Sequence, residues 1–373
     1  MFSMYSGVRV AVICVLVTAI STTAGAFEAH LPPQHLQHNE VGKGGFPCPA
    51  DADIFPCTCE FDSAGNLDLT CVNITTNDLS RVFMAEFPFN RFNKFTLQNS
   101  TIPVLENGVF GSVTFKSVLL ESNNMTTIEA LALENSYGVL EHFIMHEEPA
   151  DTPYTWPLPD IANFIHLKEI DISGPYAAME PLESSTLTDV ILSLYELTSL
   201  PPNPFSGAVG IKTLILQETK LENIEPRTFE LLTALKKLEI SDAHLKELTE
   251  SSMAFTSGSL AFVNLSKNDI SNVMKDAFSG LPKSAVVDLS DNMLLELKRD
   301  AFSSLLTSLT AGYIDVGRNP LLCGCDLVWL LYLNEEQRDR LHGLDSSCDI
   351  EGNFNFDDLL DFLEYQCSTN SPL

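Results

Sequence analysis

Basic residues are scarce in this sequence, which contains 21 Lys and Arg against 50 Asp and Glu and has a formal net charge of −29 at pH 7. Nucleic acids and anionic lipid surfaces are bound by Lys and Arg side chains that displace counterions. The acidic balance therefore argues against both and favours basic or neutral partners. Hydrophobic residues make up 45% of the chain, an ordinary value for a globular protein.

The sequence also lacks the fingerprints of common enzymes, since it contains no H-E-x-x-H, G-x-S-x-G, Walker-type or Rossmann motif. We therefore expect no catalytic activity and no cofactor. His142 and His146 are four residues apart, which on a strand is about 13 Å, so they cannot share a metal ion. His30, His35 and His38 are a candidate metal cluster, but no carboxylate or cysteine fixes their geometry.

No membrane anchor is expected. Arg9, an apolar run over residues 10–20 and the small residues Ala24, Gly25 and Ala26 follow in the order of a secretory signal peptide. This run is too short to span a bilayer. Only six residues follow Cys367, too few for a membrane span or an anchor-addition signal. The sequence thus predicts a secreted, extracellular protein.

One spacing of apolar residues returns about every 24 residues, as expected for a solenoid. One copy reads Leu260, Val263, Leu265, Asn268, Ile270, Val273, Phe278. Apolar residues two apart share one side of a short strand, and the residue between them faces the other way. Stacked turns bury the apolar positions and form a parallel sheet. Ten turns are predicted to start at Phe92, Phe115, Leu140, Leu167, Leu187, Ile211, Leu235, Leu260, Ser284 and Ala311.

This spacing resembles the L-x-x-L-x-L-x-x-N-x-L pattern of leucine-rich repeats, and we identify the chain as a member of that family. The resemblance implies an α/β repeat fold, a solenoid with short parallel strands on its concave face. The consensus asparagine is present as Asn123, Asn268, Asn292 and Asn319, and is replaced by Ser100, Glu148, Pro175, Tyr195, Thr219 and Ala243. A stack of phenylalanines is predicted on the convex side at Phe110, Phe205, Phe229, Phe278 and Phe302.

Eight cysteines remain after the signal peptide, and an even count in an exported chain favours disulfides over zinc. Four precede the repeats and four follow them, within or after the segment N-P-L-x-C-x-C-x-L-x-W-L. Within each cluster the sequence alone allows three pairings. Both clusters resemble the caps of extracellular leucine-rich repeat proteins, and this resemblance implies Cys48–Cys59, Cys57–Cys71, Cys323–Cys348 and Cys325–Cys367. An apolar helix from 327 to 333 should cover the last turn.

The predicted organisation is a signal peptide at 1–26, a linker at 27–47, an amino-terminal cap at 48–91, repeats at 92–319, a carboxy-terminal cap at 320–367 and a tail at 368–373. The solvent-facing midline of the sheet should carry Thr96, Leu119, Ile144, Asp171, Ile191, Ile215, Glu239, Asn264, Asp288 and Asp315. We expect Leu119, Ile144, Ile191, Leu194 and Ile215 to bind a protein partner, because contiguous exposed apolar surface marks interaction sites. The alternative is that aliphatic residues simply favour strands.

Other positions carry weaker signals. Asp288 and Asp315 should lie side by side and are candidates for a calcium site or an acid and base pair, although solvated carboxylates are the simpler interpretation. Glycosylation sequons begin at Asn73, Asn99, Asn124 and Asn264. The proline-rich segment 149–159 should form a loop, whose Tyr154 and Trp156 either anchor a partner or fold back onto the array.

More narrowly, the sequence resembles a group of secreted arthropod chains that includes the non-catalytic partner of a luciferase. The resemblance implies a non-enzymatic chain that forms a hetero-oligomer with another secreted protein, here a luciferase-type catalytic subunit. An innate-immune pattern-recognition protein and an extracellular-matrix adhesion protein are the alternatives. A hydrolase or oxygenase would have to rely on Asp288 and Asp315.

Overall fold

The computed structural model describes residues 46–348, except 159, and residues 356–367. The predicted signal peptide, the linker up to residue 45, the three histidines at positions 30, 35 and 38, and the tail lie outside the described residues. Among the described residues, none of the helices combines the length and apolarity needed to cross a bilayer.

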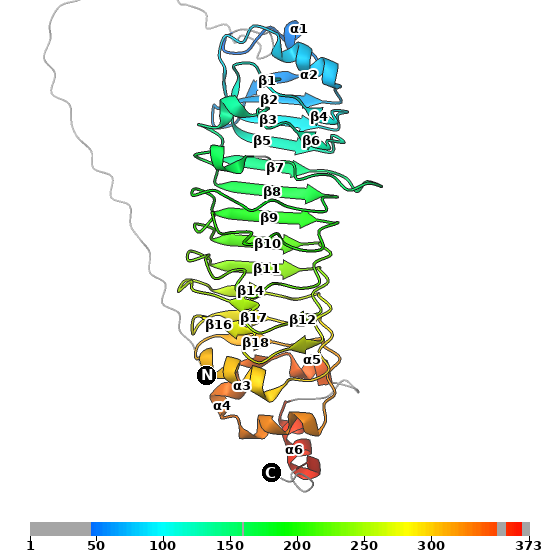
Figure 1. Cartoon of the computed structure of the whole chain (residues 1–373), viewed down its shortest axis with the longest axis vertical. Coiled ribbons are helices and arrows are strands. Elements are labelled where there is room, and N and C mark those ends of the chain that lie inside the picture. Colours follow the sequence, from blue (N-terminus) through cyan, green and yellow to red (C-terminus); the bar gives the residue numbers. More distant parts are fainter. Residues whose placement is uncertain (1–45, 159, 349–355, 368–373) are drawn as a thin grey trace, which may run out of the picture. The chain divides into compact units, whose positions relative to one another are not determined.

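A thirteen-stranded sheet runs through the described part of the chain, with strands in the order of the sequence (Figure 1). Each of the ten predicted turns contributes one strand, and neighbouring turns pair in parallel. These strands are β3 (Arg91–Gln98), β5 (Thr114–Glu121), β7 (His142–His146), β8 (Glu169–Gly174), β9 (Asp189–Leu194), β10 (Thr213–Gln217), β11 (Lys237–Ser241), β14 (Phe262–Asn264), β17 (Val286–Asp288) and β18 (Tyr313–Asp315).

The alternation of burial in most strands confirms the predicted periodicity, but Thr96 on β3, which was predicted to face solvent, is buried between two buried neighbours. In β10, Leu214 and Leu216 are fully buried while Ile215 between them is only partly covered. The register aligns Ile191 with Ile215 and Ile215 with Glu239. All ten predicted midline positions fall in one column in the same way. The leucine-rich repeat solenoid predicted from the sequence is therefore the observed fold.

Short elements complete the return path of the chain behind the sheet. Parallel two-residue strands pair β4 (Val104–Leu105) with β6 (Thr127–Ile128), β12 (Glu247–Leu248) with β15 (Asn272–Val273), and β13 (Met253–Ala254) with β16 (Phe278–Ser279). The helical pieces are η1 (Glu134–Ser136), η2 (Ile161–Asn163) and α3 (Arg299–Ser308). These short elements enclose the apolar interior on the side away from the open sheet face.

The consensus asparagines tie each turn to the one before it. Asn292 Nδ2 donates to the carbonyl oxygens of Leu265 (2.9 Å), Leu289 (3.0 Å) and Ser290 (3.0 Å), and its Oδ1 accepts the backbone N–H of Ile270 (3.1 Å). Asn268 and Asn319 repeat this arrangement. A single buried amide thus satisfies backbone groups that the bend of the chain would leave without partners.

A carboxylate takes this role where the asparagine is missing after β7. Glu147 is buried, and both of its carboxylate oxygens accept the backbone N–H of Asn123 at 3.1 Å. Burial raises the pKa of the Glu147 carboxyl, while hydrogen bonds from the backbone of Asn123, Asn124 and Met125 act in the opposite direction. The prediction that Glu148 replaces the asparagine was off by one residue, since Glu148 is exposed.

The phenylalanine stack is only partly as predicted. The rings of Phe205 and Phe229 stack at 6.1 Å, but the next ring in the stack is Phe255, at 6.2 Å from Phe229. Phe278, the predicted member, is only half-buried in the two-residue strand β16. The irregular turn from 235 to 260 places its phenylalanine two residues later than its neighbours do.

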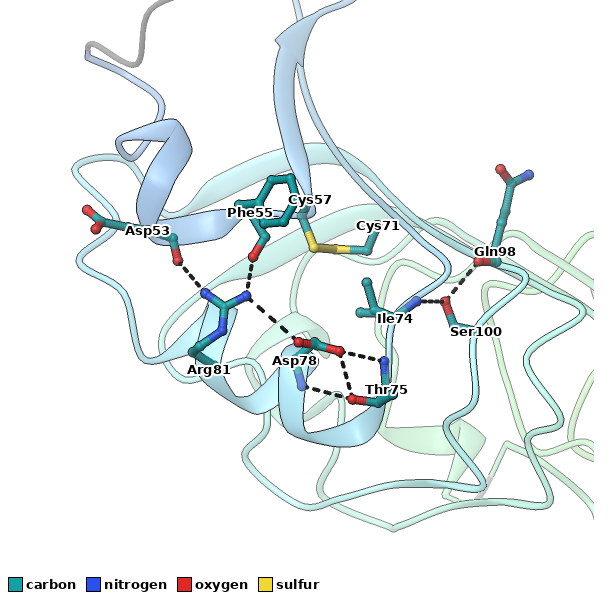
Figure 2. Close-up of a disulfide and its surroundings, with 10 residues drawn as sticks. All are labelled: Asp53, Phe55, Cys57, Cys71, Ile74, Thr75, Asp78, Arg81, Gln98 and Ser100. Carbon is teal, nitrogen blue, oxygen red and sulfur yellow. Dashed lines mark hydrogen bonds and ion pairs between the residues drawn. A yellow bond between two sulfur atoms is a disulfide. The ribbon is translucent and has the colours of Figure 1, made fainter.

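The amino-terminal cap extends the sheet ahead of the first repeat, and Figure 2 shows its Cys57–Cys71 disulfide near the hydrogen bonds of Arg81. It contains α1 (Asp51–Ile54), β1 (Thr58–Phe61), β2 (Leu67–Val72) and α2 (Thr76–Phe83), and β2 pairs in parallel with β3. The guanidinium of Arg81 on α2 donates to the carbonyl oxygens of Asp53 and Phe55, which holds α1 against α2. Cys48–Cys59 and Cys57–Cys71 are bonded as the family resemblance implied.

The carboxy-terminal cap covers the last turn. It consists of η3 (Cys325–Tyr332), α4 (Glu335–Arg338), β19 (Leu341–His342), α5 (Leu344–Cys348) and α6 (Phe356–Cys367). Trp329 is buried, and its indole N–H donates to the carbonyl of Leu297 at 2.9 Å. The implied bonds Cys323–Cys348 and Cys325–Cys367 are present. The covering segment is a 3₁₀ helix.

The asparagine contacts predict unequal costs of mutation along the array. Replacing Asn292 by Ala leaves the Ile270 N–H and three carbonyl groups without that partner, so we expect a loss of about 2–4 kcal/mol in the free energy of unfolding. Thr219, at the same position of a degenerate turn, accepts only one long hydrogen bond, from Leu221 at 3.4 Å. Thr219→Ala should cost less than about 1 kcal/mol. Urea unfolding of the two variants measures the difference, and equal losses would contradict it.

Candidate protein-binding surface

The open face of the sheet presents columns of side chains, and successive strands contribute one residue to the central column. The central column is the predicted midline, and neighbouring members lie about 4.8 Å apart. Leu119 aligns with Ile144, and Ile191 aligns with Ile215. All four side chains are partly exposed. The sheet therefore brings two apolar pairs to its solvent-facing midline.

Asp171 on β8 separates these pairs, because it lies between Ile144 and Ile191 in the register. His146 reaches across from β7, and its Nε2 lies 3.1 Å from Asp171 Oδ1. This hydrogen bond raises the pKa of His146 and outweighs the opposing effect of partial burial. On the other flank His142 Nδ1 lies 2.8 Å from Glu169. The apolar midline is thus crossed by one polar bridge.

Leu194 is not part of this surface, so its prediction as a partner-binding residue was wrong. Its side chain is fully buried. The alternation of β9 ends at Leu192, after which Ser193 and Leu194 are both buried. The backbone N–H of Leu197 bonds to the carbonyl of Leu194 at 3.0 Å, so the chain is already turning and directs this leucine into the core.

The polar half of the midline carries Asp288 and Asp315, which lie side by side as predicted. Each carboxylate bonds to its own strand end: Asp288 Oδ1 accepts the backbone N–H of Ser290 at 2.9 Å, and Asp315 Oδ1 accepts that of Gly317 at 2.8 Å. Within the described ranges no group of three or more side chains is arranged to hold a metal ion. Their visible role is to fix the turn that follows each strand.

Sequence reasoning missed a second apolar column beside this acidic half. Phe262, Val286 and Tyr313 align in register at the start of their strands, and all three are partly exposed. The Tyr313 ring stacks on the His342 ring, with centroids 4.2 Å apart. Each of the three residues lies two positions before a midline residue. The alternation that predicted the midline therefore also predicts that these three side chains face the same side of the sheet.

The sequons divide into two groups. Asn73, Asn99 and Asn124 are exposed, and each follows the end of a strand. The backbone N–H of Asn73 bonds to Gln98 and that of Asn99 to Glu121, so these two occupy successive turns. Asn264 lies on the open face and is partly buried, and its Oδ1 accepts the N–H of Ser266 at 2.9 Å. Glycans at the first three sites would line the edge where strands end.

The loop after β7 returns its aromatic residues to the array. Tyr154 is half-buried, pairs as an isolated bridge with Tyr176, and its ring lies 5.9 Å from the Tyr176 ring. Trp156 is also half-buried, and its indole N–H donates to Leu158 at 3.0 Å. Of the two interpretations left open by the sequence, the structure shows the one in which these residues fold back.

The His146–Asp171 pair gives the chain a pH dependence near neutrality. The folded-state pKa of His146 lies above its ordinary value of 6.5, so the stabilisation is complete below about pH 6.5 and is lost as pH rises through the raised pKa. Because the side chain is 39% exposed, we expect only about 0.5 kcal/mol. An NMR titration of the His146 ring should give a midpoint above 6.5. His146→Gln should remove this pH dependence of unfolding, whereas His244→Gln, which removes an exposed pair with Asp269, should not.

Comparison with known proteins agrees with this geometry. Residues 185–245, which include β9, β10 and β11, match the model of the leucine rich repeat family. Over 301 residues the chain is 23% identical to the Oplophorus-luciferin 2-monooxygenase non-catalytic subunit of Oplophorus gracilirostris, covering 78% of this chain and 81% of that one. A shorter match, 36% identical over 110 residues, is to the leucine-rich repeats and immunoglobulin-like domains protein 2 of Mus musculus. It covers 28% of this chain and 10% of that protein.

A solved structure is similar in fold. A chain from the octameric complex of Latrophilin 3, Unc5D and FLRT2, in which the FLRT2 part is a leucine-rich repeat, superposes with a TM-score of 0.50 at 17% identity. The match covers 76% of this chain and 90% of that one. The chain is therefore a leucine-rich repeat solenoid with a disulfide-bonded cap at each end, and along most of its length it resembles the non-catalytic subunit of Oplophorus-luciferin 2-monooxygenase.

Proposed function

We propose that this chain is a secreted, non-enzymatic subunit that binds another secreted protein through the apolar midline of its open face. The observation that carries the proposal is the alignment of Ile191 with Ile215 on adjacent strands, with both side chains partly exposed. Four disulfides support an extracellular location, because such bonds persist in oxidising compartments. The exposed sequons at Asn73, Asn99 and Asn124 are the proposed glycosylation sites.

The partner proposed is a catalytic chain of the luciferase type. The support is the similarity to a relative that is itself named a non-catalytic subunit and of which 81% is covered. The open face suits protein binding, because neighbouring aliphatic side chains provide the water-excluding centre that protein interfaces need. The carboxylates of Asp288 and Asp315, which bond to their own backbones, support a structural role over a catalytic one.

A single substitution can place a glycan in the middle of this surface. Ile191→Asn creates a sequon, because Leu192 and Ser193 follow it just as Leu265 and Ser266 follow the natural sequon residue at the midline of β14. In a secreting cell line this variant should gain one glycan and lose at least about tenfold in affinity for the catalytic chain, measured by calorimetry after copurification from native secretion. The bulky sugar would cover the apolar pair on β9 and β10.

Two controls separate the sugar from the side-chain change. Ile191→Asn combined with Ser193→Ala carries the same asparagine but no sequon, so most of the binding should return. Leu295→Asn combined with Leu322→Asn replaces two exposed aliphatic residues that lie off the open face, and affinity should stay unchanged. Undiminished binding of the glycosylated Ile191→Asn variant would refute the proposed surface. Binding to microbial glycans with no protein partner recovered would favour a pattern-recognition role instead.

A further inference from the structure

At the edge of the sheet where the strands begin, one column of residues is rich in lysine. The backbone N–H of Glu141 donates to the carbonyl of Lys116, and the N–H of Lys168 donates to the carbonyl of Glu141. The same backbone hydrogen bond then joins each turn to the one before it, at Thr188, Lys212 and Lys236. These six residues occupy successive turns, and we call their column the leading edge (left in Figure 1, at the blunt ends of the arrows). Four cations and one anion therefore align on a protein whose net charge is −29.

The lysines of the leading edge are not all used within the fold. Glu141 lies 3.3 Å from Lys116 and 2.6 Å from Lys168 and therefore bridges these two. Lys212 and Lys236 are exposed, and among the described residues their ammonium groups have no hydrogen-bond or ion-pair partner. Two ammonium groups of this column are thus available to an anionic ligand, although Glu169 and Asp189 begin the neighbouring strands β8 and β9.

An exposed apolar strip follows the same edge. Phe46, Phe61 and Ile165 have 80%, 60% and 60% of their surface exposed, and Val139 and Val209 are also exposed. Residues of the cap and the first turns line an open hollow of about 750 Å³, with aromatic side chains that include Phe61 and Phe89, the cations Arg91 and Lys116, and the anion Glu141. Exposed aromatic side chains beside cations in this hollow are a candidate binding site.

The leading edge is separate from the open face and from the sugars. Asn73, Asn99 and Asn124 follow the ends of β2, β3 and β5, at the opposite edge of the sheet, and Asn264 lies on the open face. No glycosylation sequon begins within the leading edge. Glycans at all four sites would therefore leave this surface accessible.

We propose that the leading edge is a second docking surface, which binds an extended acidic segment of a partner protein that carries an aromatic side chain. Lys116, Lys168 and Lys212 are each two turns apart, or about 10 Å. In an extended segment of polyproline II geometry, with three residues per turn and a rise of about 3.1 Å per residue, side chains three residues apart share one face and lie about 9 Å apart. The spacing therefore selects a segment with a carboxylate at every third residue, while its aromatic side chain enters the hollow beside Phe61.

A protein segment fits this surface better than a polysaccharide or a lipid. A sulfated polysaccharide would use the lysines but leave the exposed phenylalanines unburied. A lipid ligand needs a pocket that buries most of its surface, whereas Phe46 and Phe61 are largely exposed at the rim. An acidic segment with an aromatic anchor satisfies both the charge and the apolar surface.

The test uses the full-length secreted chain and three fluorescein-labelled peptides. The first has glutamate at every third position and phenylalanine near each end, the second has the same composition with its glutamates contiguous, and the third has lysine in place of glutamate. Fluorescence anisotropy should show the first peptide binding about tenfold more tightly than the second and the third not binding. Equal binding of all three, or no binding of the first at millimolar concentration, would overturn the proposal.

Variants locate the contact. Lys212→Glu with Lys236→Glu removes no hydrogen bond or ion pair of the fold and should weaken the first peptide at least about tenfold, with a smaller effect at high salt. Phe61→Ser with Ile165→Ser should weaken it by a similar factor. The control Lys275→Glu with Lys298→Glu makes the same change in net charge on exposed sites away from the edge and should leave binding unchanged.

The outcomes distinguish other occupants and the first proposal. If heparin competes and the Phe61→Ser pair has no effect, the edge is a polyanion site and the peptide proposal fails. If a chain starting at Phe46 binds the first peptide and the full-length secreted chain does not, the natural occupant is the segment 27–45 of the same chain, and the proposal of a partner segment is overturned. The Ile191→Asn glycan should not affect peptide binding at the leading edge. Peptide binding therefore tests the leading edge alone, and binding of the catalytic chain tests the open face alone.

Discussion

The structure depends on one constraint: every turn must provide hydrogen bonds for the backbone of the turn before it. Parallel pairing meets this need within the strands, but the chain bends sharply after each strand and leaves polar groups inside. Asn292 and its equivalents satisfy these groups with one amide. A buried amide is neutral and both donates and accepts, so it performs this role without the desolvation cost of a charge. Four of the ten turns carry this amide, and the other six keep a similar length with different residues at its position.

The irregular middle of the array shows what happens when the amide is absent. Glu147 provides two acceptor oxygens to the backbone of Asn123, but its carboxyl is buried and its pKa is raised. Nearby, Gly174 is followed by the fully buried Tyr176, and a Cβ at position 174 would lie 2.7 Å from that ring. The aromatic residue fills space at a turn where the consensus asparagine is missing. Different side chains can thus provide the hydrogen bonds that the backbone of a turn needs and fill the space inside it.

The features of the fold that depend on strict periodicity could be predicted from the sequence. The register of the ten midline residues and all four disulfide pairs are as predicted, the first from alternation and the second from family resemblance, but Thr96 in that column is buried where solvent exposure was predicted. Leu194 and Phe278 were mispredicted, because each lies where a strand or turn departs from the repeat and the backbone path decides which way a side chain faces. The column of Phe262, Val286 and Tyr313 obeys the alternation, but it becomes a surface only when the register of three strands is known.

The leading edge illustrates why binding surfaces are harder to predict than folds. Its lysines are separated by about 24 to 52 residues in the sequence, so no single stretch of the sequence contains the column. Stacking brings one residue of each turn into a column and so converts a period in the sequence into a line in space. Averaged over the chain, charge indicates an acidic protein, whereas charge resolved by position within the repeat shows a basic edge. In a solenoid, the residues found at each repeat position therefore indicate the chemistry of a partner better than the composition of the whole chain does.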